Sequence, residues 1–131
     1  MAVTVDQGGR VVVTKNGGPV RSDSPAGQMA IKIFGPDVEF PSGRGSNYPK
    51  VNGDPKNRHA EARGMQAFIH GDTNITFDSG EVRQACSHYA CSVCSQKQQN
   101  HGIENITDKT KPLNYNNIGR PYVSDLWQLE D

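Results

Sequence analysis

Short strand-like runs alternate with helix-like segments along this chain, and this alternation constrains the fold more than any other feature. Strands are predicted over residues 11–14, 29–34, 74–77 and 103–107, where β-branched or alternating apolar residues lie between turn formers. Helices are predicted over residues 59–70 and 91–101, and each is followed by a glycine. The predicted order is strand, strand, helix, strand, helix, strand, which indicates an α/β domain with helices flanking a sheet.

The length of 131 residues fits one domain spanning residues 1–131, with residues 1–27 expected to form a loosely packed N-terminal strand and loop. The chain contains no apolar run long enough to span a membrane and no signal peptide pattern at its start, so it is expected to be soluble. Lys and Arg balance Asp and Glu at 14 each. Residues 1–63 nevertheless carry nine basic and six acidic side chains, a net +3, which favours the first half as the side that meets a polyanion.

Two further segments have an unusual glycine or proline content. Gly64 lies inside the predicted helix, where it costs about 1 kcal/mol relative to alanine, and this indicates close packing of the helix against a sheet. Residues 40–57 contain three prolines and three glycines and support no periodic element. This segment is interpreted either as a solvated surface loop or as a loop that contacts substrate.

All three cysteines, Cys86, Cys91 and Cys94, fall within nine residues. An odd number cannot pair completely within the chain, so this cluster favours a metal site or reactive thiols over a disulfide framework. Cys91 and Cys94 are three residues apart on a predicted helix and therefore face the same side.

A histidine and a glutamate begin the first predicted helix as His59-Ala60-Glu61. One histidine with two thiolates makes a three-ligand zinc site with an open fourth position, which is typical of catalytic zinc. An H-x-E motif followed by C-x-x-C is also the spacing of the zinc deaminases, in which the glutamate is a general acid and base and not a ligand. The two motifs in this order, on helices that alternate with strands, are far more specific than either alone.

The segments RHAE (58–61) and SHYACSVC (87–94) resemble the active site of the cytidine deaminase-like superfamily. The APOBEC group of nucleic-acid cytosine deaminases has a similar R-H-A-E segment followed by S-W-S-P-C-x-x-C. The small size and the Gly/Pro-rich segment before the histidine resemble more closely the deaminase domains of bacterial polymorphic toxins. Ala90 stands where the family usually has proline, and His88 stands where the APOBEC pattern has tryptophan.

This resemblance implies a mixed sheet flanked by helices, with the zinc site at two helix N-termini. It implies that His59, Cys91 and Cys94 hold Zn²⁺, while Glu61 transfers the protons that convert cytosine to uracil. The implied substrate is double- or single-stranded DNA, and the implied setting is a secreted bacterial effector domain that acts in the cytoplasm of a target cell. The chain is then expected to be a monomer that does not bind membranes, with a cognate immunity protein as a further partner.

Two sets of side chains are the candidate substrate contacts under this resemblance. The flipped base is expected to meet Ser87, His88, Asn57, Tyr48, Tyr89 and Ala60. The nucleic-acid backbone is expected to meet Arg44, Lys50, Lys56 and Arg58.

Two alternatives remain open at this point. The same chemistry could act on free cytidine or on RNA, and a tetramer in solution would favour the nucleoside. From another class, Cys86, Cys91, Cys94 and His101 could form a closed structural zinc site in an interaction module, which would leave His59 and Glu61 as ordinary helix residues.

Overall fold

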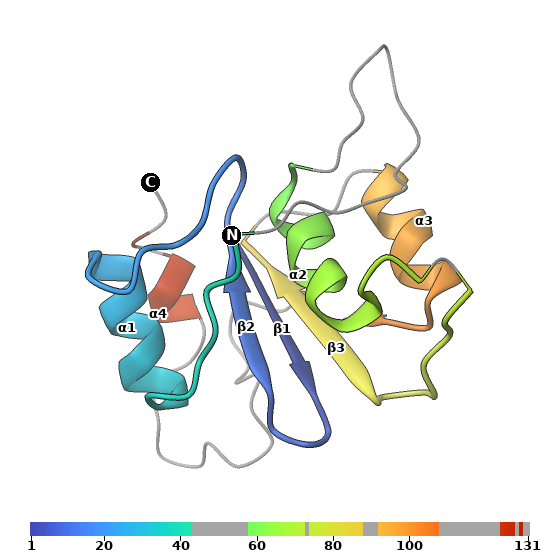
Figure 1. Ribbon diagram of the computed structural model, residues 1–131, viewed down its shortest axis with the longest axis horizontal. Coiled ribbons are helices and arrows are strands. Elements are labelled where there is room, and N and C mark those ends of the chain that lie inside the picture. Colours follow the sequence, from blue (N-terminus) through green and yellow to red (C-terminus); the bar gives the residue numbers. More distant parts are fainter. Residues whose placement is uncertain (43–57, 73, 88–91, 108–123, 128, 130–131) are drawn as a thin grey trace.

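The chain folds into a mixed β-sheet with helices on both faces, seen in a computed structural model that describes residues 1–42, 58–72, 74–87, 92–107, 124–127 and 129 (Figure 1). The strands are β1 (Ala2–Asp6), β2 (Val11–Thr14), β3 (Val82–Cys86) and β4 (Glu104–Asn105), in the order β2-β1-β3-β4. Strand β1 is antiparallel to both β2 and β3, whereas β3 and β4 are parallel. The predicted α/β class is confirmed.

Strand β1 lies at the centre of the sheet, and the sequence analysis missed it. Its register with β3 pairs Ala2 with Cys86 and Asp6 with Val82. The side chains of Ala2 and Val3 are fully buried. The expectation that residues 1–27 form a loosely packed strand and loop is therefore wrong for β1, because β2 and β3 pair with both of its edges.

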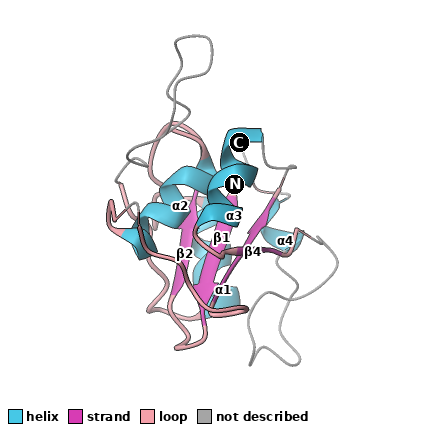
Figure 2. Cartoon of the chain, turned by 90° about the vertical axis from the view of Figure 1, so that its right-hand side faces the viewer, coloured by secondary structure: helices cyan, strands magenta, loops and turns pink. Residues whose placement is uncertain are grey.

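Helices cover the two faces of the sheet in pairs (Figure 2). Helix α1 (Pro25–Phe34) lies on one face with α4 (Ser124–Trp127), and α2 (Ala60–Ile69) lies on the other with α3 (Ser92–Asn100). Alternate residues of each strand face opposite layers, as the pleat requires. The α1 layer is built on Val3, Val5, Val11, Val13, Ala85 and Ile33, and the α2 layer on Val12, Val82, Ala62, Met65 and Phe68.

The prediction of a strand over residues 29–34 is wrong, because this segment belongs to helix α1. The alternation there is local, whereas the burial of Ala26, Ala30 and Ile33 follows the helical period. Ser24 caps the helix by accepting a hydrogen bond from the N–H of Gly27 at 3.0 Å, and Pro25 occupies the first turn. These start signals lie upstream of the alternating run.

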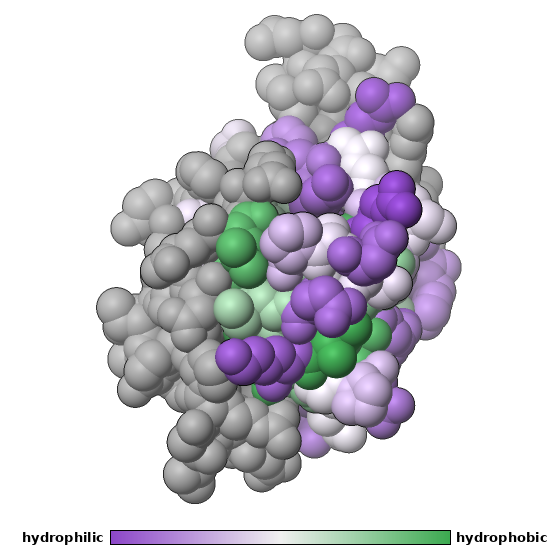
Figure 3. All heavy atoms as spheres, turned by 90° about the vertical axis from the view of Figure 1, so that its left-hand side faces the viewer, coloured by the Kyte–Doolittle hydropathy of each residue, from purple (hydrophilic) through white to green (hydrophobic). Residues whose placement is uncertain are grey.

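Helix α1 also carries partly buried apolar side chains, including Met29, Ile31 and Phe34, which pack against the core. Exposed polar residues such as Lys32 lie between them, and the space-filling view of this side shows apolar surface broken up by hydrophilic side chains (Figure 3). Among the described residues, the helices are too short or too polar to cross a membrane.

The strand predicted over residues 74–77 is also wrong, and β3 forms instead at Val82–Cys86. Phe77 donates its backbone N–H to the carbonyl of His101 at 2.8 Å, so this segment lies beside the end of α3 and not in the sheet. The predicted helices are confirmed as α2 and α3, and the last predicted strand is confirmed in part as the short β4. Strand β3 was not predicted because its central residue is the polar Gln84, which interrupts the apolar pattern although its side chain is buried against helix α2.

Helix α2 approaches the sheet closely at Gly64, which confirms the expectation for this glycine. A Cβ atom at this position would lie 2.5 Å from the hydroxyl of Thr4 and 3.0 Å from the side-chain nitrogen of Gln84. The α2 face of β1 and β3 is therefore polar at its centre, and a residue without a side chain lets the helix backbone reach it.

Candidate metal centre

The N-terminus of α2 is held by the last residue of β2 and by the segment that follows this strand. His59 is the N-cap residue, yet its side chain makes no capping hydrogen bond. The side-chain oxygen of Asn16 instead accepts from the N–H of Ala60 at 2.6 Å, and the hydroxyl of Thr14 donates to the carbonyl of Ala60 at 2.6 Å. A third bond joins the N–H of Gly17 to the carbonyl of Arg58 at 3.0 Å. These contacts fix the backbone around His59 without using its ring.

The ring of His59 faces the first turns of α3. Its Nδ1 lies 3.6 Å from the Sγ of Cys94, a residue that is fully buried. Glu61 completes the group, because one ligand atom from each of His59, Glu61 and Cys94 lies within 4.8 Å of the others. The structure therefore brings together three residues from two helices that are close enough to bind one metal ion.

The distance between His59 and Cys94 fits tetrahedral zinc. Zinc bonds of about 2.0–2.1 Å to a histidine nitrogen and about 2.3 Å to a thiolate place the two ligand atoms about 3.5 Å apart at the tetrahedral angle. The observed separation of 3.6 Å matches this value. A nitrogen and a sulfur are also the donor types that zinc prefers in proteins.

Glu61 lies between this pair and Cys86. Its side chain is buried, with 8% of its surface exposed, and the Cys86 thiol lies within hydrogen-bonding reach of its carboxylate and of Thr107. Burial, followed by the charge of Glu61, raises the pKa of the Cys86 thiol. A raised pKa favours the protonated thiol, and Cys86 packs against Ala2 and Ala60 as a small buried apolar side chain.

The alternative closed zinc site receives no support from its described members. Cys86, Cys94 and His101 form no three-residue ligand group in the described part of the chain. The Nδ1 of His101 instead lies 2.7 Å from the carbonyl oxygen of Ile75, which belongs to the loop segment beside the end of α3. His101 therefore anchors a loop.

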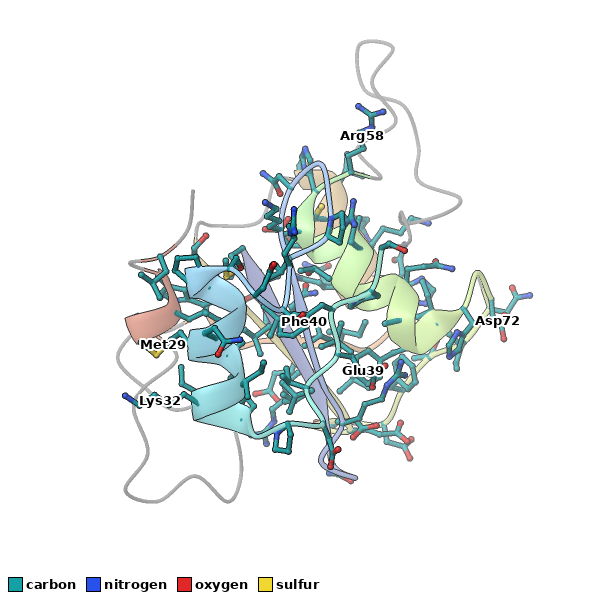
Figure 4. All side chains as sticks on the ribbon, turned by 60° about the vertical axis from the view of Figure 1, so that its left-hand side comes forward. Met29, Lys32, Glu39, Phe40, Arg58 and Asp72 are labelled. Atoms are coloured by element: carbon teal, nitrogen blue, oxygen red, sulfur yellow. The ribbon has the colours of Figure 1, made fainter. Side chains whose placement is uncertain are left out.

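Three of the predicted substrate or backbone contacts are described by the structure. Arg58 is exposed just before α2, and its side chain extends away from the sheet (Figure 4). Ser87 follows β3 and is buried, with its hydroxyl accepting from the amino group of Met1 at 2.8 Å. Ala60 is buried at the start of α2. Their roles toward a substrate stay predictions.

The other predicted site residues lie outside the described residues. They are the third zinc ligand Cys91, the base-contact candidates His88, Asn57, Tyr48 and Tyr89, and the backbone-contact candidates Arg44, Lys50 and Lys56.

Sequence reasoning missed the residues that hold the site in place. Asn16 caps α2 from a different part of the chain, and Gln84 contacts the carbonyl of Glu61 from β3 at 3.0 Å. Asn16 could be recognised only as part of the Asn-Gly-Gly-Pro turn, because its partner is remote in sequence. A buried glutamine in a strand leaves no pattern beyond a break in the apolar alternation.

No protein-family model, curated protein or solved structure matches this chain in sequence or fold.

Proposed function

We propose that this protein is a zinc-dependent cytosine deaminase that acts on nucleic acid. The observation that supports it most is the 3.6 Å separation between His59 Nδ1 and Cys94 Sγ, with the carboxylate of Glu61 in the same group. The arrangement agrees with the H-x-E and C-x-x-C motifs, and the mixed sheet with flanking helices agrees with the deaminase-like fold that the resemblance implies. His59, Cys91 and Cys94 are the proposed ligands.

Zinc at this site would supply a Lewis acid that lowers the pKa of a coordinated water toward neutrality. In the proposed reaction, water adds to C4 of cytosine, the bond from C4 to the exocyclic nitrogen breaks, and ammonia leaves. Glu61 accepts a proton from the attacking water and delivers it to N3, then accepts the proton of the new C4 hydroxyl and delivers it to the departing amine, so that C4 becomes a carbonyl carbon. Its place on the first turn of α2, two residues after His59, puts the carboxylate beside the ligands.

The choice of nucleic acid, and of DNA in particular, rests on the resemblance to toxin deaminases and on the basic excess of residues 1–63. Arg58 supports this choice, because an exposed guanidinium at the N-terminus of α2 can contact a phosphate close to the metal centre. The target base would leave its stack to reach Glu61, at a cost of a few kcal/mol. A toxin of this kind would be delivered into another cell and neutralised by a cognate immunity protein.

The decisive experiment incubates the zinc-loaded protein separately with single-stranded DNA, double-stranded DNA, RNA and cytidine, and measures uracil or uridine. We expect uracil in DNA. The matched control is Glu61→Gln, which keeps the size of the side chain but cannot accept the proton. General acid and base groups contribute about 10²–10⁴-fold, so this variant should lose at least that factor while it retains zinc.

Each other outcome has a distinct meaning. If product forms only from RNA or only from cytidine, the proposed reaction stands, but the proposed substrate, DNA, is wrong. Failure of the zinc-loaded protein on all four substrates, or near-normal turnover by Glu61→Gln, would refute the proposed mechanism.

A further inference from the structure

Two buried side-chain amides, those of Gln84 and Gln98, connect the two helices that carry the metal centre. Gln84, fully buried on β3, donates from its side-chain nitrogen to the backbone carbonyl of Glu61 at 3.0 Å. Its side-chain oxygen accepts from Gln98 of α3 at 2.7 Å. The oxygen of Gln98 in turn accepts from Asn105 of β4 at 3.2 Å.

The side chain of Gln84 can make these bonds because Thr4 lies beside it and Gly64 of α2 lies above it. Its side-chain nitrogen also donates to the hydroxyl of Thr4 at 2.8 Å, so both amide hydrogens are used. Gly64 leaves the space above this nitrogen open, since a Cβ there would come within 3.0 Å of it. Buried polar networks of this kind are favourable only when every member is satisfied, and they then hold their elements in one arrangement.

The two ends of the amide pair lie next to residues of the metal centre. At one end, the acceptor is the carbonyl of Glu61 itself. At the other end, Gln98 follows Cys94 by four positions on α3, and residues so spaced share a helix face. The spacing between Glu61 and Cys94 is therefore set through Gln84 and Gln98.

We propose that Gln84 is a positioning residue, which holds the first turn of α2 and helix α3 at the separation that lets His59 and Cys94 bind one metal ion with the carboxylate of Glu61 beside it. Its side-chain amide bonds to Thr4, to the carbonyl of Glu61 and to Gln98, and it is not a member of the ligand group. This inference rests on the proposed metal centre and adds to it the element that sets its geometry.

The test compares Co²⁺ binding by the full chain and by three variants, each followed through the thiolate-to-cobalt absorption and the ligand-field spectrum. Gln84→Met removes the bond to Glu61, and Gln98→Met removes the bond between the amides. Thr4→Val is the matched control, because it removes a bond from the same buried nitrogen but not the connection to α2. Residues that orient metal ligands typically change metal affinity 10–100-fold, so we expect that loss in both glutamine variants, an altered ligand-field spectrum in Gln84→Met, and less than threefold loss in Thr4→Val.

The outcomes separate this inference from the proposed function. Wild-type protein that does not bind Co²⁺ would refute the metal centre itself. If the wild type binds and both glutamine variants bind equally well, or if Thr4→Val weakens binding as much as Gln84→Met, the positioning role is refuted while the metal centre stands. Should Gln84→Met fail to fold, Gln98→Met gives the answer, because it leaves the bond from Gln84 to Glu61 in place.

Discussion

The side-chain oxygen of Asn16 accepts a 2.6 Å hydrogen bond from the backbone N–H of Ala60, a residue 44 positions further along the chain. An N-cap side chain ordinarily accepts a hydrogen bond from the second or third helical N–H, but here the N-cap residue is His59, whose side chain makes no such bond. The capping oxygen is thus supplied by another segment, and the imidazole of His59 lies instead beside the Sγ of Cys94.

Replacing Asn16 with alanine should destabilise the protein by about 0.5–2 kcal/mol, the usual cost of losing an N-cap acceptor. Urea denaturation measures this change. Asn16→Asp is the control, since it keeps the acceptor and places a negative charge at the positive end of α2. If Asn16→Ala unfolds at the same urea concentration as the wild type, the bond from Ala60 to Asn16 does not contribute to the stability of the protein.

Metal content after dialysis should be one zinc per chain. His59→Ala, Cys91→Ser and Cys94→Ser should each lose the metal, because each removes one of the proposed protein ligands. Cys86→Ser should retain it, since this thiol lies among Ala2, Ala60 and Glu61 and is not part of the ligand group. Loss of zinc in Cys86→Ser with retention in His59→Ala would instead support the closed structural site.

Gly64→Ala should destabilise the protein even though alanine is the better helix former by about 1 kcal/mol. The added methyl group would lie 2.5 Å from the Thr4 hydroxyl in a packed layer, and such overpacking typically costs about 1–3 kcal/mol. Gly18→Ala is the matched control, because nothing lies within 4 Å of a Cβ there. Thermal unfolding should show a lower midpoint only for Gly64→Ala, and an equal midpoint for both variants would contradict the close approach.

The ion pair between Arg10 and Glu39 predicts a small pH dependence of stability. A hydrogen bond from the Arg10 guanidinium, at 2.6 Å, lowers the pKa of the Glu39 carboxyl. A carboxyl with a lowered pKa stabilises the folded state above its unfolded pKa of about 4.3, and this stabilisation is lost as the pH falls through the folded pKa. Because both side chains are about a third or more exposed, the effect should be only about 0.2–1 kcal/mol.

Urea denaturation of Glu39→Gln from about pH 6 down to about pH 3 tests this pair, in the range around the ordinary glutamate pKa. The variant should be less stable than the wild type near neutrality, and the difference should shrink as the pH falls. Asp37→Asn removes a nearby exposed carboxylate and serves as the control for net charge. A difference that stays constant with pH would exclude a role for the ionised pair.

The helices around the metal centre could be predicted from sequence because their signals are local. His59 and Gly71 bracket α2, and the apolar period within it is regular. Strand β1 and the amide of Gln84 could not be predicted, because their stabilising partners come from remote segments. The alternating run at residues 29–34 was misleading because a six-residue window cannot separate a short strand from the last turns of a helix.

The central position of β1 also determines when this protein can fold during synthesis. The hairpin of β1 and β2 can form as soon as residue 14 is available, but the other edge of β1 pairs only with residues 82–86. Until that later segment leaves the ribosome, the nascent chain carries an unpaired strand edge, which is prone to associate with other chains. Cys94 lies on α3, the next described element after β3, so the two halves of the metal centre can meet only after the residues of β3 have been synthesised.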